Sequence, residues 1–185
     1  MGRGEESMEK NIFFECDKKL SLMDYLNFSE EGRCNLGSEI PVMVYRLLEY
    51  SLKEQLEEEF GAEKQKEIFR NAGKRAGTFF AEKMLNLFLP VNEFVLQLQE
   101  KMQDLKIGIL RIEKFDDQTG TVVLTVSEDA DCSGLPVLGE AVCNYDEGFI
   151  SGILSKYYEC TYNVIEIDCW ATGDRVCRFC AEKDK

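Results

Sequence analysis

The sequence predicts an α+β domain, in which an antiparallel sheet of about four strands is covered by helices. Apolar residues recur at helical spacing through the first half of the chain. After Lys106 the sequence changes to short runs that are rich in β-branched residues and in which apolar and polar residues alternate. The resulting order is helices, two strands, a helix and two more strands, which favours an antiparallel sheet over which the helices pack.

The chain is long enough for one domain with a substantial core, since it has 185 residues, of which 44% are hydrophobic. Residues 1–37 are predicted to be an N-terminal segment with a flexible start and a short strand over 11–16. Residues 38–185 are predicted to form the single globular domain.

Three helices are predicted ahead of the first strand, over residues 38–60, 62–89 and 92–105. Gly61 ends the first helix and Pro90 separates the second from the third. In the second helix, Gly73 and Gly77 lie four residues apart on one face, a spacing that permits close approach of another helix or of a ligand, tight packing being the more common reason. The first helix has apolar residues at helical spacing, namely Val42, Tyr45, Leu48, Leu52 and Leu56.

Two predicted hairpins complete the sheet. The first pairs residues 107–115 with 121–127 through a turn that ends in Gly120. A loop over 128–138 and a helix over 141–159 follow. The second hairpin pairs residues 162–170 with 175–181 around Gly173.

Charge and composition exclude several classes of function. The 35 acidic residues outnumber the 22 basic ones, giving a net charge of -13, so nucleic acid and anionic membranes are poor partners. The chain has no histidine, which removes the commonest general base. We find neither a signal-peptide pattern nor an apolar run of membrane-spanning length, and we therefore expect a cytoplasmic protein with reduced thiols.

The chemistry-bearing residues gather near the C-terminus. Cys143, Glu166, Cys169 and Cys177 offer three soft sulfurs and a carboxylate, a set that can fill a tetrahedral zinc shell. A symmetric hairpin brings Cys169 and Cys177 opposite each other. Glu166, three residues before Cys169, needs a β-bulge to reach the same face. Spacing alone leaves structural zinc, free structural thiols, and a redox or iron–sulfur site all open.

Three segments together resemble the 4-vinyl reductase domain: residues 132–136, 143–152 and 166–179. Residues 69–77 resemble the upstream helix of that domain, and the similarity spans roughly residues 40–182. The resemblance implies the fold of the TRAPP-subunit superfamily, commonly dimeric, and a cytoplasmic homodimer here. It also implies one zinc ion held by Cys143, Glu166, Cys169 and Cys177, as in the sensory domains of phenol- and xylene-responsive activators.

The same resemblance implies a pocket for a small hydrophobic molecule between the helices and the sheet. The positions that anchor the phenol hydroxyl in those sensors fall near Phe94 and Val122, both apolar, which favours an apolar ligand. The predicted lining is Phe94, Leu98, Val122, Leu124, Phe149 and Val164, each of which could equally be ordinary core.

We expect a zinc-stabilised module that binds or senses a hydrophobic molecule. The alternatives are an enzyme or accessory protein of tetrapyrrole or vinyl-group reduction, and a dimeric protein-interaction module. The chain lacks a glycine-rich dinucleotide motif, which argues against a nicotinamide or flavin enzyme. The roles of the remaining cysteines stay open: Cys16, Cys34, Cys132, Cys160 and Cys180.

Overall fold

The computed structural model describes residues 20–26, 30–116 and 118–184. The chain divides into two units, residues 1–41 and 42–185. The first contains helix α1 (Leu22–Leu26) and a 3-10 turn over Glu30–Arg33. The predicted strand over 11–16 lies outside the described residues.

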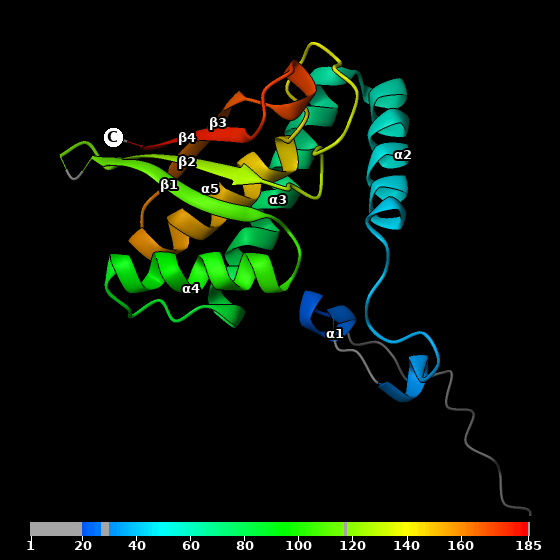
Figure 1. The fold of residues 1–185 in the computed structure, drawn as a ribbon, viewed down its shortest axis with the longest axis horizontal. Helices are drawn as coiled ribbons and strands as arrows, with labels where there is room; N and C mark the ends of the chain where they lie inside the picture. Colours follow the sequence, from blue (N-terminus) through cyan, green and yellow to red (C-terminus); the bar gives the residue numbers. More distant parts are fainter. Residues whose placement is uncertain (1–19, 27–29, 117, 185) are drawn as a thin grey trace, which may run out of the picture. The chain divides into compact units, whose positions relative to one another are not determined.

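The second unit has the predicted α+β architecture, with four helices and one four-stranded antiparallel sheet (Figure 1). Its helices are α2 (Val42–Phe60), α3 (Ala62–Met84), α4 (Val91–Asp104) and α5 (Asn144–Tyr158). Its strands are β1 (Ile109–Asp116), β2 (Thr121–Ser127), β3 (Tyr162–Asp168) and β4 (Cys177–Lys183). The strand order is β1-β2-β4-β3, so the two predicted hairpins join through the β2–β4 pair.

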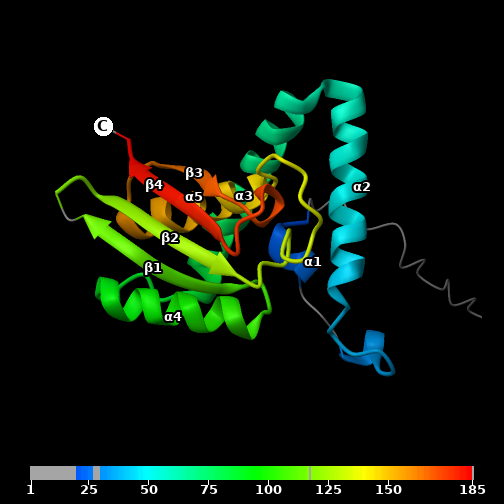
Figure 2. The ribbon, with the colours of Figure 1, turned by 45° about the horizontal axis from the view of Figure 1, so that its top comes forward.

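The core lies between the sheet and the helices α4 and α5. Alternate residues of β2, namely Val122, Leu124 and Val126, point to this side and are buried. Figure 2 shows α4 running along β1, and α5 lying against the sheet. Residues of α4, β1, β2 and α5 therefore meet in one apolar layer.

Helices α3 and α5 pack at the shortest distance that backbones allow. A Cβ atom at Gly73 would lie 2.0 Å from the carbonyl oxygen of Tyr145, and one at Gly77 would lie 2.0 Å from that of Phe149. Gly148 of α5 meets the carbonyl oxygen of Arg70 in the same way. The predicted close approach at Gly73 and Gly77 is thus a backbone-to-backbone contact, which no side chain can adjust.

Helix α2 has an inverted burial pattern. Its buried residues are charged, Glu49 and Lys53, whereas Leu48 is 70% and Leu52 48% exposed. The apolar stripe predicted for this helix therefore does not enter the core, because the surface on which α2 packs is the polar backbone of the loop between β2 and α5. None of the described helices is long and apolar enough to cross a membrane.

Candidate functional site

Four cysteine sulfurs converge in the interior of the second unit. The Sγ atoms of Cys132, Cys143, Cys169 and Cys177 all lie within 4.8 Å of one another, and all four residues are fully buried. The Sγ of Cys143 is 3.8 Å from that of Cys169 and 3.7 Å from that of Cys177. Such a group of soft ligands suits a tetrahedral metal ion.

Each sulfur comes from a different place in the fold. Cys132 lies in the turn after β2, and Cys143 caps the N-terminus of α5. Cys169 directly follows β3, and Cys177 begins β4. A metal ion at this point would therefore tie a loop, a helix and a hairpin together.

Cys132 is the member that sequence analysis left without a role. It stands outside the hairpin and belongs to a segment with no periodic pattern, so spacing did not connect it to the others. The signal available was its place in the Cys132–Pro136 segment, one of the three that carry the resemblance.

Glu166 lies beside the cluster without joining that group. The register of β3 against β4 shifts between Glu166 and Asp168, which confirms the predicted bulge. Glu166 is buried in regular alternation with Tyr162 and Val164, and the shift after it lets Cys169 lie on the same side. Its Oε2 accepts a hydrogen bond from the backbone N–H of Cys143 at 3.1 Å. Its Oε1 is buried and has no hydrogen-bond partner in the described part of the chain.

The thiols act on one another electrostatically. Hydrogen bonds from Cys132, Cys143 and Cys177 lower the pKa of Cys169, whereas the neighbouring sulfurs raise the pKa of Cys143. Burial, followed by the contact with Cys169, raises the pKa of Glu166 to about 8. A divalent cation at this point would stabilise the ionised form of the thiols.

The distances test whether these residues fit zinc. Zn–S bonds of about 2.3 Å place the sulfurs of a tetrahedral site about 3.8 Å apart. Two of the distances, 3.7 and 3.8 Å, match this edge. The third, 3.0 Å between Cys132 and Cys177, is shorter. The donor set and the two distances from Cys143 therefore fit the metal.

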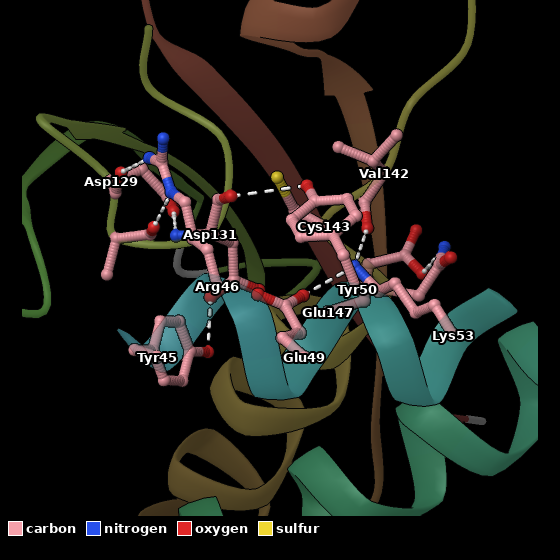
Figure 3. Close-up of polar contacts among 12 residues, drawn as sticks. Tyr45, Arg46, Glu49, Tyr50, Lys53, Asp129, Asp131, Val142, Cys143 and Glu147 are labelled. Carbon is pink, nitrogen blue, oxygen red and sulfur yellow. Dashed lines mark hydrogen bonds and ion pairs between the residues drawn. The ribbon is translucent and has the colours of Figure 1, made fainter. Parts of the chain in front are cut away.

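Figure 3 shows α2 in contact with the loop of Asp129 and Asp131, which precedes Cys132 in the chain. The guanidinium of Arg46 donates to the carbonyl oxygens of Ala130, Asp129 and Ser133 at 2.7, 3.3 and 2.8 Å. The hydroxyl of Tyr50 donates to the carbonyl oxygen of Asp131 at 3.2 Å. These contacts fix the backbone on both sides of Cys132.

The same helix also holds the residue before Cys143. Lys53, only 8% exposed, donates from Nζ to the carbonyl oxygen of Val142 at 2.9 Å. At α5, Glu147 accepts from the backbone N–H of Glu166 at 2.9 Å and from Arg70 at 2.5 Å. Both sides of the Cys143 turn are thus anchored to neighbouring elements.

A buried group of carboxyls borders this interface: Glu49, Asp129, Asp131 and Asp146. Burial raises the pKa of Glu49 and of Asp129 to about 7 each. Burial, and after it the charges of Asp129 and Asp131, raise the pKa of Asp146 well above its ordinary value. At neutral pH part of this group is protonated, which limits the repulsion between neighbouring acids.

Glu49→Gln is expected to stabilise the protein at alkaline pH. The folded-state pKa of Glu49, about 7, exceeds its ordinary value of 4.5, so the stability it contributes is complete below pH 4.5 and is lost as the pH rises through 7. The neutral amide removes this loss, on the order of 3 kcal/mol. Urea unfolding of both proteins at pH 4.5 and pH 8 measures it. An equal difference at the two pH values would contradict this ionisation.

An apolar cavity of about 140 Å³ lies between α4, the β1–β2 hairpin and α5. Four predicted pocket residues line it: Phe94, Leu98, Val122 and Leu124. Phe149 and Val164 do not, since Phe149 packs edge-on against Phe80 of α3 and Val164 lies on β3, the edge strand farthest from β1. Sequence analysis did not foresee the part of the wall formed by Ile150, Ile153, Leu154 and Tyr158 of α5.

The residues flanking the hairpin ligands have structural contacts of their own. Trp170 donates from its indole N–H to the carbonyl oxygen of Leu135 at 2.9 Å, and Arg178 forms ion pairs with Glu113 and Asp168. Cys180 lies outside the sulfur cluster, since residues three apart on β4 point to opposite faces.

Residues 122–183 match the family model of the 4-vinyl reductase domain, which confirms the resemblance seen in the sequence. Protein MJ0150 of Methanocaldococcus jannaschii is 25% identical over 176 residues, covering 95% of this chain and 94% of that protein. Protein MJ1642 of the same organism is 28% identical over 83 residues, 45% of this chain and 49% of that protein.

Solved structures confirm the fold. The phenol-responsive sensory domain of the transcription activator PoxR, determined with phenol, aligns with a TM-score of 0.61 at 14% identity, covering 80% of this chain and 76% of that one. A vinyl-4-reductase family protein from Methanocaldococcus jannaschii gives 0.60 at 13% identity, covering 92% and 99%. A trafficking protein particle complex subunit 3 from Naegleria fowleri, covalently bound to palmitic acid, gives 0.63 at 11% identity, covering 78% and 95%. The fold is therefore TRAPP-subunit-like.

Proposed function

We propose that this chain, whose residues 122–183 match the 4-vinyl reductase domain, is a module that binds or senses a small hydrophobic molecule and is held in shape by zinc. The cavity of about 140 Å³ carries the proposal. It approaches the size of an engineered apolar cavity of about 150 Å³ that binds benzene. The neighbouring fold of a phenol-responsive sensory domain supports the same kind of function.

The lining of the cavity indicates the class of ligand. Phe94, Leu98 and Leu124 are apolar and at most 5% exposed, and Asn92 and Tyr158 supply the polar side chains. Since burial of apolar area would be the main source of affinity, an apolar molecule with a single ring is the ligand that fits best. The metal would contribute indirectly, because Cys143 begins the helix whose later turns form one wall of the cavity.

Val122→Phe is expected to abolish ligand binding by filling the cavity. In the unchanged protein, toluene at 100 times its Kd should add about 2.7 kcal/mol to the free energy of unfolding. Val123→Phe is the matched control, because Val123 is the next residue of β2 and does not line the cavity. Thermal unfolding with and without toluene measures the difference. Equal stabilisation of the two variants would show that the ligand binds elsewhere.

We also propose that the module works as a cytoplasmic homodimer. The outward face of α2 supports this, since Met43, Leu47 and Leu48 are each about 70% exposed. Native mass spectrometry of the purified chain tests the whole proposal, because one spectrum shows the zinc content, the oligomeric state and any retained ligand. A monomer without zinc or ligand, together with an absence of toluene binding, would contradict it.

A further inference from the structure

We propose that four thiolates hold the metal, with Cys132 as the fourth ligand, and that Glu166 orients Cys143 from outside the coordination shell. The inference rests on the proposed metal binding and changes the ligand set expected from the sequence. That set had Glu166 in the fourth place, beside Cys143, Cys169 and Cys177.

Geometry favours Cys132 over Glu166. The Sγ of Cys132 lies within 4.8 Å of all three other sulfurs, whereas no carboxylate oxygen of Glu166 belongs to this group. The contact of 3.0 Å between Cys132 and Cys177 is about 0.8 Å shorter than a tetrahedral zinc edge. A displacement under about 1 Å at the turn of Cys132 would restore that edge.

Glu166 has a structural role outside the proposed coordination shell. Its Oε2 accepts from the backbone N–H of Cys143, and its own backbone N–H donates to Glu147. These two hydrogen bonds connect the bulge of β3 to the first turn of α5. Its Oε1 has no hydrogen-bond partner among the residues that the structure describes, which makes Glu166 the direct competitor of Cys132, so the test must separate the two residues.

The loop that carries Cys132 is held in place by hydrogen bonds from two sides. Arg46 and Tyr50 bind its backbone from α2, and the indole of Trp170, next to Cys169, donates to Leu135 from the hairpin side. A ligand that is fixed in advance by such contacts loses little entropy on binding.

The charges on α2 also suit a site made of four thiolates. Four thiolates around a divalent ion carry two surplus negative charges. Lys53 and Arg46 bring positive charge to the backbones of the loops that bear Cys143 and Cys132. Replacing the carboxylate of Glu166 by a thiolate leaves this charge unchanged and exchanges a hard ligand for a soft one, which zinc in structural sites favours.

X-ray absorption at the zinc edge of the full chain tests the ligand set directly. We expect four sulfur neighbours at about 2.3 Å and no oxygen neighbour at about 2.0–2.2 Å. Three sulfurs and one oxygen would overturn the inference while leaving metal binding in place. A protein without metal that contains a Cys132–Cys177 disulfide would overturn both. This measurement needs no variant, so a failure of any variant to fold leaves the inference testable.

Variants separate the two residues in solution. Cys132→Ser should lower zinc affinity more than about 100-fold in a chelator competition and leave three sulfurs in the shell. Glu166→Gln should keep four sulfurs and lose no more than about 10–100-fold, the usual effect of removing a group that orients a ligand. Cys180→Ser, whose thiol lies outside the cluster, should match the unchanged protein. Four retained sulfurs in Cys132→Ser, or the loss of a ligand in Glu166→Gln, would overturn the inference.

Discussion

Gly77→Ala is expected to lower the free energy of unfolding by at least about 3 kcal/mol, because it forces a methyl group into a contact between two helix backbones. The new Cβ would lie 2.0 Å from the carbonyl oxygen of Phe149, a backbone atom that cannot rotate away. Helices α3 and α5 would have to separate along their whole contact. At about 2–4 °C for each kcal/mol, the melting temperature should fall by about 6–12 °C.

The control for this prediction is the reverse change earlier in the same helix. Ala72 is exposed, so Ala72→Gly measures only the intrinsic cost of glycine in a helix, about 1 kcal/mol. Alanine is a better helix former than glycine, so Gly77→Ala would stabilise the helix if the clash with α5 did not occur. A Gly77→Ala protein as stable as the unchanged one would show that α3 and α5 are not in close contact.

Removal of the metal is the second large effect. We expect a strong chelator to lower the free energy of unfolding by on the order of 5 kcal/mol, because metal binding to a buried site adds directly to folding stability. Cys177→Ser should cause a similar loss, since the four sulfurs are fully buried and converge on one point.

Cys180→Ser provides the matched control, because Cys180 lies three residues further along β4 and outside the sulfur cluster. Urea unfolding of each protein, with and without chelator, separates loss of metal from loss of packing. The chelator should destabilise Cys180→Ser strongly and have no further effect on Cys177→Ser. A chelator effect of the same size in both variants would place the metal elsewhere.

The regular elements could be predicted because their signals are local. In the second unit the spacing of apolar residues located the helices, although α3 ends at Met84 rather than at the predicted Leu89, and alternation located both hairpins. The short helix α1 was not predicted. The spacing of Gly73 and Gly77 indicated a close approach, which the structure shows to be a helix contact. The spacing of Glu166 and Cys169 required a bulge, and the register of β3 contains one. Each of these inferences needs only neighbours along the chain.

The buried face of helix α2 could not be predicted from neighbouring residues in the sequence. Its pattern predicts a helix correctly, but the pattern cannot tell which face is buried. The buried face is the one with Arg46, Glu49 and Lys53, because the surface that it meets consists of carbonyl groups of the loop between β2 and α5. Leu48 remains exposed as a result.

The sequence by itself determined the fold class, the hairpins and three of the four converging sulfurs, because those features follow from periodicity and short spacings. Only the tertiary structure decided the fourth sulfur and the wall of the cavity. Cys132 reaches the cluster from a loop without periodicity, which contacts made by α2 hold in place. Ile153 and Tyr158 line the cavity because α5 packs against the sheet as well as against α3, which its Gly148 meets backbone to backbone, and only long-range packing sets that position.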